Sequence, residues 1–185
     1  VQVGLRNEYT EWETRQRVKN QLYTKRNDNI LFPSFFVSRE MGDGNSLSLS
    51  YTQSINRPLY QMVNPFVFHL SETSYKEGNP DLKGELLYNA GLQFMLKSKY
   101  IFSLSALFID RKINEIYEQI GEYQTRYMLR NNGTTKRLTL YMGIPFTWGI
   151  WNCRNNVELS QSWYQNSANC VNDFGVVLSS YNRIR

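Results

Sequence analysis

The sequence predicts an all-β fold, an antiparallel up-and-down meander of about eight strands. Apolar and polar residues alternate with a period of two along most of the 185 residues, and no stretch has convincing helical periodicity. Short and long connections follow one another along the chain. This order is expected for a meander with short turns at one end of its strands and long loops at the other. The expected strands lie near residues 1–11, 30–40, 46–56, 85–97, 100–115, 122–147, 152–165 and 172–184.

The alternation is clearest from residue 46 onward. In the third expected strand, Leu47, Leu49 and Tyr51 lie opposite a row of serines. The strand at 122–147 is interrupted near Asn131-Asn132-Gly133, and the pattern continues less regularly over 174–181. The apolar faces of the other strands hold Leu86, Tyr88, Ala90, Leu92, Phe94 and Leu96; Tyr100, Phe102, Leu104, Ala106 and Phe108; Leu138, Leu140, Met142, Ile144, Phe146 and Trp148; and Val157, Leu159 and Trp163.

The expected connections fall into two groups. Three are tight, at 42–45, 97–99 and 148–151. Four are longer and polar, at about 12–29, 56–84, 116–122 and 165–171. Short turns at one rim and long loops at the other are typical of outer-membrane barrels.

The chemistry of the two strand faces favours a transmembrane barrel. The polar face is mostly Ser, Thr, Asn, Gln and Gly, whereas a soluble sheet usually exposes a charged face. An apolar face with aromatic ends, opposite a small-polar face, fits a wall between lipid and an aqueous interior. A soluble β-sandwich or lipocalin-like barrel remains the alternative. The aromatic residues at the ends of the apolar face are Tyr51, Tyr88, Tyr100, Trp148, Trp151, Trp163 and Tyr164.

Composition and motifs argue against other classes of function. The net charge is +5, but the basic residues are scattered, so we expect no nucleic-acid partner. The longest apolar run, Tyr100–Ile109, is too short for a transmembrane helix. There is no phosphate-binding loop, metalloprotease motif or nucleophile elbow. The single histidine, His69, lies in the longest loop. We therefore expect no enzyme activity, cofactor or metal site.

The two cysteines, Cys153 and Cys170, are expected at opposite ends of neighbouring strands. About twelve strand residues would separate them, or roughly 40 Å. A disulfide needs Cα atoms within about 7 Å. The strand map therefore predicts that these cysteines are not bonded to each other.

Several motifs resemble the barrel domain of Gram-negative outer-membrane proteins related to the TonB-dependent receptors. The resemblance lies in Phe32-Pro33-Ser34, in "SYTQSINRP" ending at Pro58, in Asn64-Pro65-Phe66 and in "EGNPDLKGE" over 77–85. Upstream, "VGLRNEYT" at 3–10 resembles a strand of the same family. Where the family usually has proline, this chain has Gly84. Beyond residue 115 only the strand pattern continues.

The resemblance implies that the stretch 54–85 is an extracellular loop. Three X-Pro bonds (Arg57-Pro58, Asn64-Pro65 and Asn79-Pro80) favour a loop that folds back without extending the sheet. Its aromatic residues are expected to order the loop or to face a ligand. These candidate residues are Tyr60, Phe66, Phe68, His69 and Tyr75.

The same resemblance implies a role in nutrient uptake at the cell outer membrane. Receptors of that type have 22 strands around a plug, so we expect residues 1–185 to be one partial barrel segment that lacks the plug. The absence of an initial Met agrees with a mature or excised piece. Expected partners are lipid, the rest of the barrel, the plug, a TonB-type periplasmic protein and an unknown nutrient. Two alternatives remain, a soluble carbohydrate-binding module and a small autonomous eight-stranded outer-membrane protein.

Overall fold

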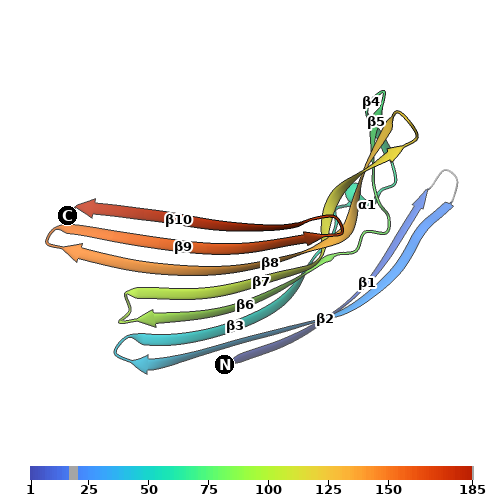
Figure 1. Cartoon of the computed structure of the whole chain (residues 1–185). Helices are drawn as coiled ribbons and strands as arrows, with labels where there is room; N and C mark the ends of the chain where they lie inside the picture. Colours follow the sequence, from blue (N-terminus) through green and yellow to red (C-terminus); the bar gives the residue numbers. More distant parts are fainter. Residues whose placement is uncertain (17–20, 185) are drawn as a thin grey trace.

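A computed structural model describes residues 1–16 and 21–184 as one ten-stranded sheet with one short helix. Eight long strands form an antiparallel meander, as predicted, and two short strands lie inside the longest loop (Figure 1). The elements are β1 (Gln2–Gln16), β2 (Gln21–Gly42), β3 (Asn45–Asn56), α1 (Tyr60–Val63), β4 (Val67–Ser71), β5 (Ser74–Glu77), β6 (Glu85–Leu96), β7 (Tyr100–Ile120), β8 (Gln124–Trp148), β9 (Trp151–Asn166) and β10 (Cys170–Ile184).

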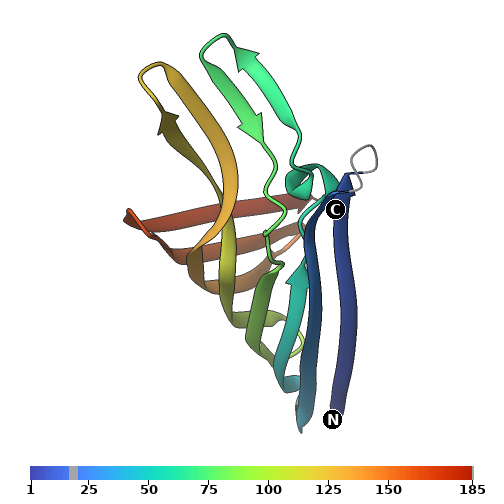
Figure 2. The ribbon, with the colours of Figure 1, turned by 90° about the vertical axis from the view of Figure 1, so that its right-hand side faces the viewer.

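The sheet is a single curved layer with two open edges. Within the described residues, β1 pairs only with β2, and β10 pairs only with β9. Figure 2 shows the curved layer from the long-loop end, with β1 at one edge and β10 at the other. The three tight turns lie together at one end in Figure 1, and the long connection between β3 and β6 lies at the opposite end.

Three of the four predicted long connections are wrong, because the strands continue through most of them. The connection predicted at 165–171 is reduced to residues 167–169 between β9 and β10. β1 and β2 stay paired as far as Gln16 and Gln21, so the predicted loop 12–29 is largely strand; residues 17–20 lie outside the described part. β7 and β8 stay paired as far as Ile120 and Gln124, so the predicted loop 116–122 is strand up to residue 120. These extensions lack a regular alternation of apolar and polar residues, so apolar periodicity does not detect them.

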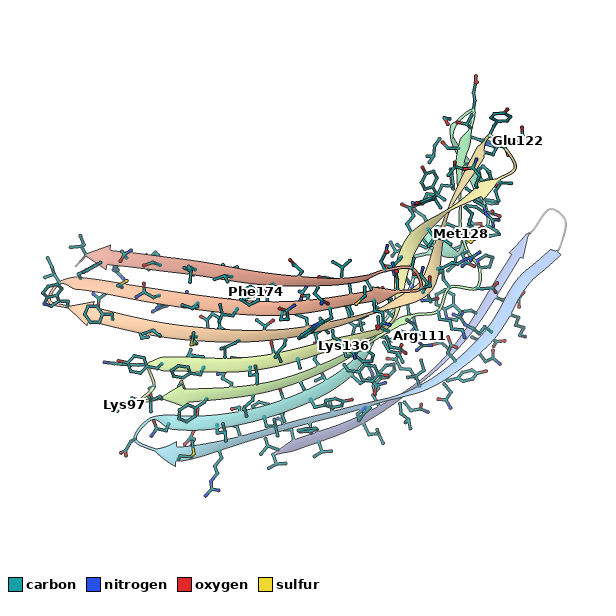
Figure 3. All side chains as sticks on the ribbon, in the orientation of Figure 1. Lys97, Arg111, Glu122, Met128, Lys136 and Phe174 are labelled. Atoms are coloured by element: carbon teal, nitrogen blue, oxygen red, sulfur yellow. The ribbon has the colours of Figure 1, made fainter. Side chains whose placement is uncertain are left out.

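The two faces of the meander differ as the alternation predicts. One cross-strand row, the aliphatic row, consists of Val37, Leu49, Leu92, Leu104, Leu140, Leu159 and Val176. On the other face, the small-polar row consists of Ser50, Gly91, Ser105, Thr139, Ser160 and Gly175. The side chains on both faces are drawn in Figure 3.

No second sheet covers the aliphatic row in the described part of the chain. Leu49 and Leu104 are 44% and 41% exposed, although both lie in the middle of the sheet. The soluble sandwich is therefore wrong, because it would press this face against another sheet to form a dry core. Few apolar side chains are buried among the described residues, and most of these lie near the long-loop end; they include Phe32, Pro58, Val63, Leu82 and Cys153.

Aromatic residues mark both ends of the apolar face. At the turn end Trp148 pairs with Trp151, and at the long-loop end lies the rim row, which consists of Tyr88, Phe108, Lys136 and Trp163. Lys136 and Trp148 are separated by roughly 40 Å along β8. At a strand tilt near 45° this spans about 28 Å, which matches the hydrocarbon core of a bilayer. Among the described helical residues, none forms a helix long and apolar enough to cross a membrane.

The two cysteines lie at opposite ends of the β9–β10 hairpin. Cys153 pairs with Asn182 near the turn end, and Cys170 pairs with Gln165 near the long-loop end. Both are free thiols, and Cys153 is buried while Cys170 is exposed. The predicted placement is therefore confirmed.

Candidate ligand site at the long-loop rim

The loop between β3 and β6 is folded. It contains the single turn of α1, followed by the β4–β5 hairpin. The backbone turns back at Asn79, whose amide donates to the carbonyl of Met62 over 2.8 Å. Gly78 is required at this contact, because a Cβ there would lie 2.0 Å from the backbone oxygen of Asn64.

Small apolar side chains hold the base of this loop against the wall. Pro58, Val63 and Leu82 are buried. The carbonyl of Leu82 accepts a hydrogen bond of 2.9 Å from Nη1 of Arg26 on β2, and the Arg26 Nε lies 3.2 Å from Asp28 Oδ2. These contacts join the end of the loop to a strand more than fifty residues away.

A bulge in β7 receives the second half of the loop. The pairing of β7 with β8 shifts between Ile109 and Lys112, and Arg111 has a φ of 57°. Asn131, opposite this bulge, donates 2.8 Å hydrogen bonds to the carbonyls of Arg111 and Lys83, while its Oδ1 accepts a 2.7 Å bond from the Lys83 amide. The interruption predicted at Asn131-Asn132-Gly133 is therefore a bulge that anchors the loop.

Glu85 is the buried acid at the point where the loop enters β6, three residues beyond the rim row. Its side chain is 5% exposed and lies 3.0 Å from Nζ of Lys112. It also accepts 2.8 Å and 2.9 Å hydrogen bonds from the Ile113 amide and Asn56 Nδ2. Burial alone would raise the pKa of Glu85, but these donors and the charge of Lys112 outweigh burial and lower the pKa.

The β4–β5 hairpin lies beside the projecting ends of β7 and β8. β5 pairs in parallel with β8 from Ser74 opposite Thr125 to Glu77 opposite Met128. In Figures 1 and 2 these strands rise together away from the main sheet, and we call them the projecting arm. Ion pairs connect its strands: Lys76 with Glu115, Arg126 with Glu77 and Glu118, and Arg130 with Glu118.

The stability of the projecting arm should depend on pH through Glu118. A hydrogen bond from Arg126 lowers the pKa of Glu118 below its ordinary value of 4.5. Because the folded pKa is lowered, this contribution is complete above pH 4.5 and is lost as pH falls through the lowered pKa. We expect amide protection factors in residues 124–128 to fall in this acid range, as measured by hydrogen exchange. Glu118→Gln should remove much of this fall; an unchanged pH profile would contradict the prediction.

The structure distributes the predicted loop residues over the outer surface of the loop. Tyr60 on α1, Phe66 before β4 and Phe68 on β4 are 73%, 57% and 60% exposed. Only His69 and Tyr75 are brought together, with ring centroids 6.2 Å apart across the β4–β5 hairpin. The five residues therefore do not form one cluster, and their contact with a ligand stays a prediction.

A cavity of about 390 Å³ lies at the base of the loop, away from these aromatic residues. Asn56 and Glu85 on its wall belong to the polar face of β3 and β6, so the cavity opens on the interior side of the sheet. Sequence reasoning missed this cavity. The only signal in the sequence was that charged residues occur near the ends of strands that are otherwise apolar. The lining residues are Asn56, Arg57, Pro58, Leu59, Met62, Glu85, Lys112, Ile113 and Leu129.

The charges around this cavity are already paired within the protein. Arg57 Nη2 lies 2.6 Å from Glu8 on β1 and 3.1 Å from the Thr10 hydroxyl, and Lys112 is paired with Glu85. The cavity therefore has a mainly apolar lining, with a few polar groups whose charges are compensated within the protein. In the described ranges, no group of three or more His, Cys, Asp or Glu side chains is arranged to hold a metal.

Comparison with known proteins agrees with this geometry. The model of the outer membrane protein beta-barrel family matches residues 1–185. The chain belongs to this family. The protein is therefore located in the outer membrane, where its sheet spans the bilayer and its apolar face contacts lipid. Members of the family are generally not enzymes.

A solved structure has a similar arrangement of strands. The siderophore receptor PirA from Pseudomonas aeruginosa matches with a TM-score of 0.53 and 14% sequence identity, over 83% of this chain. The chain spans only 35% of the length of that receptor. At this identity the likeness shows the fold, an antiparallel sheet that matches part of a receptor barrel. No curated protein matches the chain.

Proposed function

We propose that this chain forms wall and extracellular loops of an outer-membrane receptor that takes up a nutrient by a TonB-dependent mechanism. The observation that carries the proposal is the folded loop between β3 and β6. It is anchored through Asn131, Glu85 and Leu82, and it shapes a mainly apolar cavity with a few polar groups on the interior side of the wall. A loop that only connected two strands would need none of these contacts.

The open edges of the sheet support a larger barrel. β1 and β10 have no further partner in the described part of the chain. Unpaired backbone groups are very costly in hydrocarbon, which is why spanning sheets close. We infer that further strands of the full protein complete the barrel, and that a plug domain closes its interior. The similarity to part of the barrel of PirA, a siderophore receptor, supports this view.

In this proposal the exposed aromatic residues of the loop and the cavity at its base have different roles. The exposed Tyr60, Phe66 and Phe68, together with His69 and Tyr75, make the first contact with the nutrient. The cavity beneath then receives its polar groups. The barrel wall supplies no chemistry, and energy comes from the TonB-type periplasmic protein acting on the plug.

The proposal is tested by binding of the intact protein to TonB. Detergent-solubilised outer membranes are passed over an immobilised periplasmic domain of TonB from the same cells. We expect the intact protein to be retained, while a passive porin in the same extract flows through. Passage of the intact protein with the porin would overturn the receptor proposal and favour an autonomous barrel.

A further inference from the structure

A hollow on the apolar face of the sheet lies directly below the rim row. It has a volume of about 370 Å³ and an almost entirely apolar lining. Its floor is formed by Ala90 and Ala106, which face each other on β6 and β7. All other described cross-strand neighbours of this pair on the same face are larger, so the two methyl groups leave a recess in the wall.

Aromatic side chains form the sides of this hollow. Tyr88 and Phe108 stack with centroids 5.7 Å apart above the alanine floor. Tyr51 and Trp163 lie at its two flanks. The recess has the width of a strand pair and flat, rigid walls, which suit a flexible hydrocarbon chain.

Lys136 lies at the upper edge of the hollow. Its Nζ is 5.9 Å from the centroid of the Phe108 ring. No carboxylate among the described residues lies within ion-pair distance of it. The neighbouring Arg137, on the interior face, differs: it donates hydrogen bonds of 3.0 Å and 3.1 Å to Ser162 Oγ and Tyr164 OH.

The position of Lys136 in the membrane indicates which anion its ammonium group contacts. A lysine on the lipid-facing side is costly near the bilayer midplane and nearly free of cost at the interface. The rim row lies at the interface, where lysine side chains extend toward lipid headgroups. In a membrane, the anion available to an unpaired ammonium at this depth is a headgroup phosphate.

We propose that this hollow binds one acyl chain of an anionic lipid whose headgroup phosphate is not compensated by a cation, with Lys136 on the phosphate. The lipid lies in the leaflet on the long-loop side. The site is central in the sheet, on β3 and β6 to β9, so strands added at the edges β1 and β10 leave it accessible. It depends only on the membrane location and is independent of the nutrient receptor proposal.

The test uses the intact protein in detergent micelles, incubated with equal amounts of dioleoyl phosphatidic acid and dioleoyl phosphatidylcholine. Native mass spectrometry measures which lipid is retained. We expect preference for phosphatidic acid, and a loss of about fivefold in this preference in Lys136→Gln. Arg137 also borders the hollow, but its guanidinium is bound to Ser162 and Tyr164 on the other face. The matched control Arg137→Gln therefore removes a charge at the same height on that face and should leave the preference unchanged.

A second variant tests the hollow itself. Ala106→Leu fills the floor and keeps Lys136, so retention of both lipids should fall while the preference remains. Ala90→Val serves the same purpose if Ala106→Leu fails to fold, as judged by heat-modifiable migration on gels. The proposal is overturned if wild type retains neither lipid, if Lys136→Gln and Arg137→Gln act alike, or if filling the floor changes nothing.

Discussion

Leu104→Arg should lower the free energy of unfolding by about 2–4 kcal/mol, the cost of an arginine near the bilayer midplane on the lipid face. Leu104 lies in the aliphatic row, between Leu92 and Leu140 on the neighbouring strands. It is 41% exposed without any protein covering it. Hydrocarbon is therefore its environment, and a guanidinium there loses its hydration without gaining a partner.

The matched control is Ser105→Arg, one residue along on the opposite face. Ser105 has only Gly91 and Thr139 as its cross-strand neighbours, so an arginine has room on the interior side. We expect a change within about 0.5 kcal/mol, as for ordinary surface substitutions. Both variants are measured by guanidinium unfolding of the intact protein in phosphatidylcholine vesicles, followed by tryptophan fluorescence. Equal costs, or a larger cost for Ser105→Arg, would reverse the assignment of the two faces.

Glu85→Ala should have the second largest effect, a loss of about 2–4 kcal/mol. The buried carboxylate accepts hydrogen bonds from the Ile113 amide and the Asn56 side chain, and it forms an ion pair with Lys112. Its removal leaves two donors without their acceptor and a half-exposed cation without its partner. Each buried donor left unsatisfied costs about 1–3 kcal/mol.

Two further variants separate the causes of that loss. Glu85→Gln keeps an acceptor oxygen and removes the charge, so its cost should be intermediate. Glu115→Ala removes an ion pair with Lys76 whose side chains are both 46% exposed, and should cost less than about 1 kcal/mol. The midpoint and slope of denaturant unfolding measure all three. If Glu85→Ala costs no more than Glu115→Ala, the junction between loop and wall does not depend on Glu85.

The parts of the fold that were predicted correctly are those governed by local alternation. Leu47, Leu49 and Tyr51 indicate one face of β3 whatever their neighbours are, because adjacent residues of a strand point to opposite sides. The tight turns and the placement of Cys153 and Cys170 followed from the same counting of strand residues. The apolar periodicity failed where strands leave the membrane, as at Glu115 to Ile120, because in water neither face needs to be apolar.

The candidate site could not be predicted in the same way. The sequence predicts an extracellular loop over 54–85 but not the β4–β5 hairpin inside it, whose parallel pairing with β8 joins segments about fifty residues apart. Asn131 was seen as an interruption of a strand, but its partners Lys83 and Arg111 are known only from the fold. The sequence gives no signal for the role of Glu85, because its three partners come from β3 and β7 and meet it only in the folded sheet.

The sequence by itself determined the central parts of the eight long strands and their two faces, since each depends on side chains within a few residues of one another. Tertiary structure alone decided how far the strands extend, how the long loop is held, where the cavity at its base opens and that two alanines meet below Lys136. Those features depend on register between distant strands, because small shifts in pairing change which side chains come into contact.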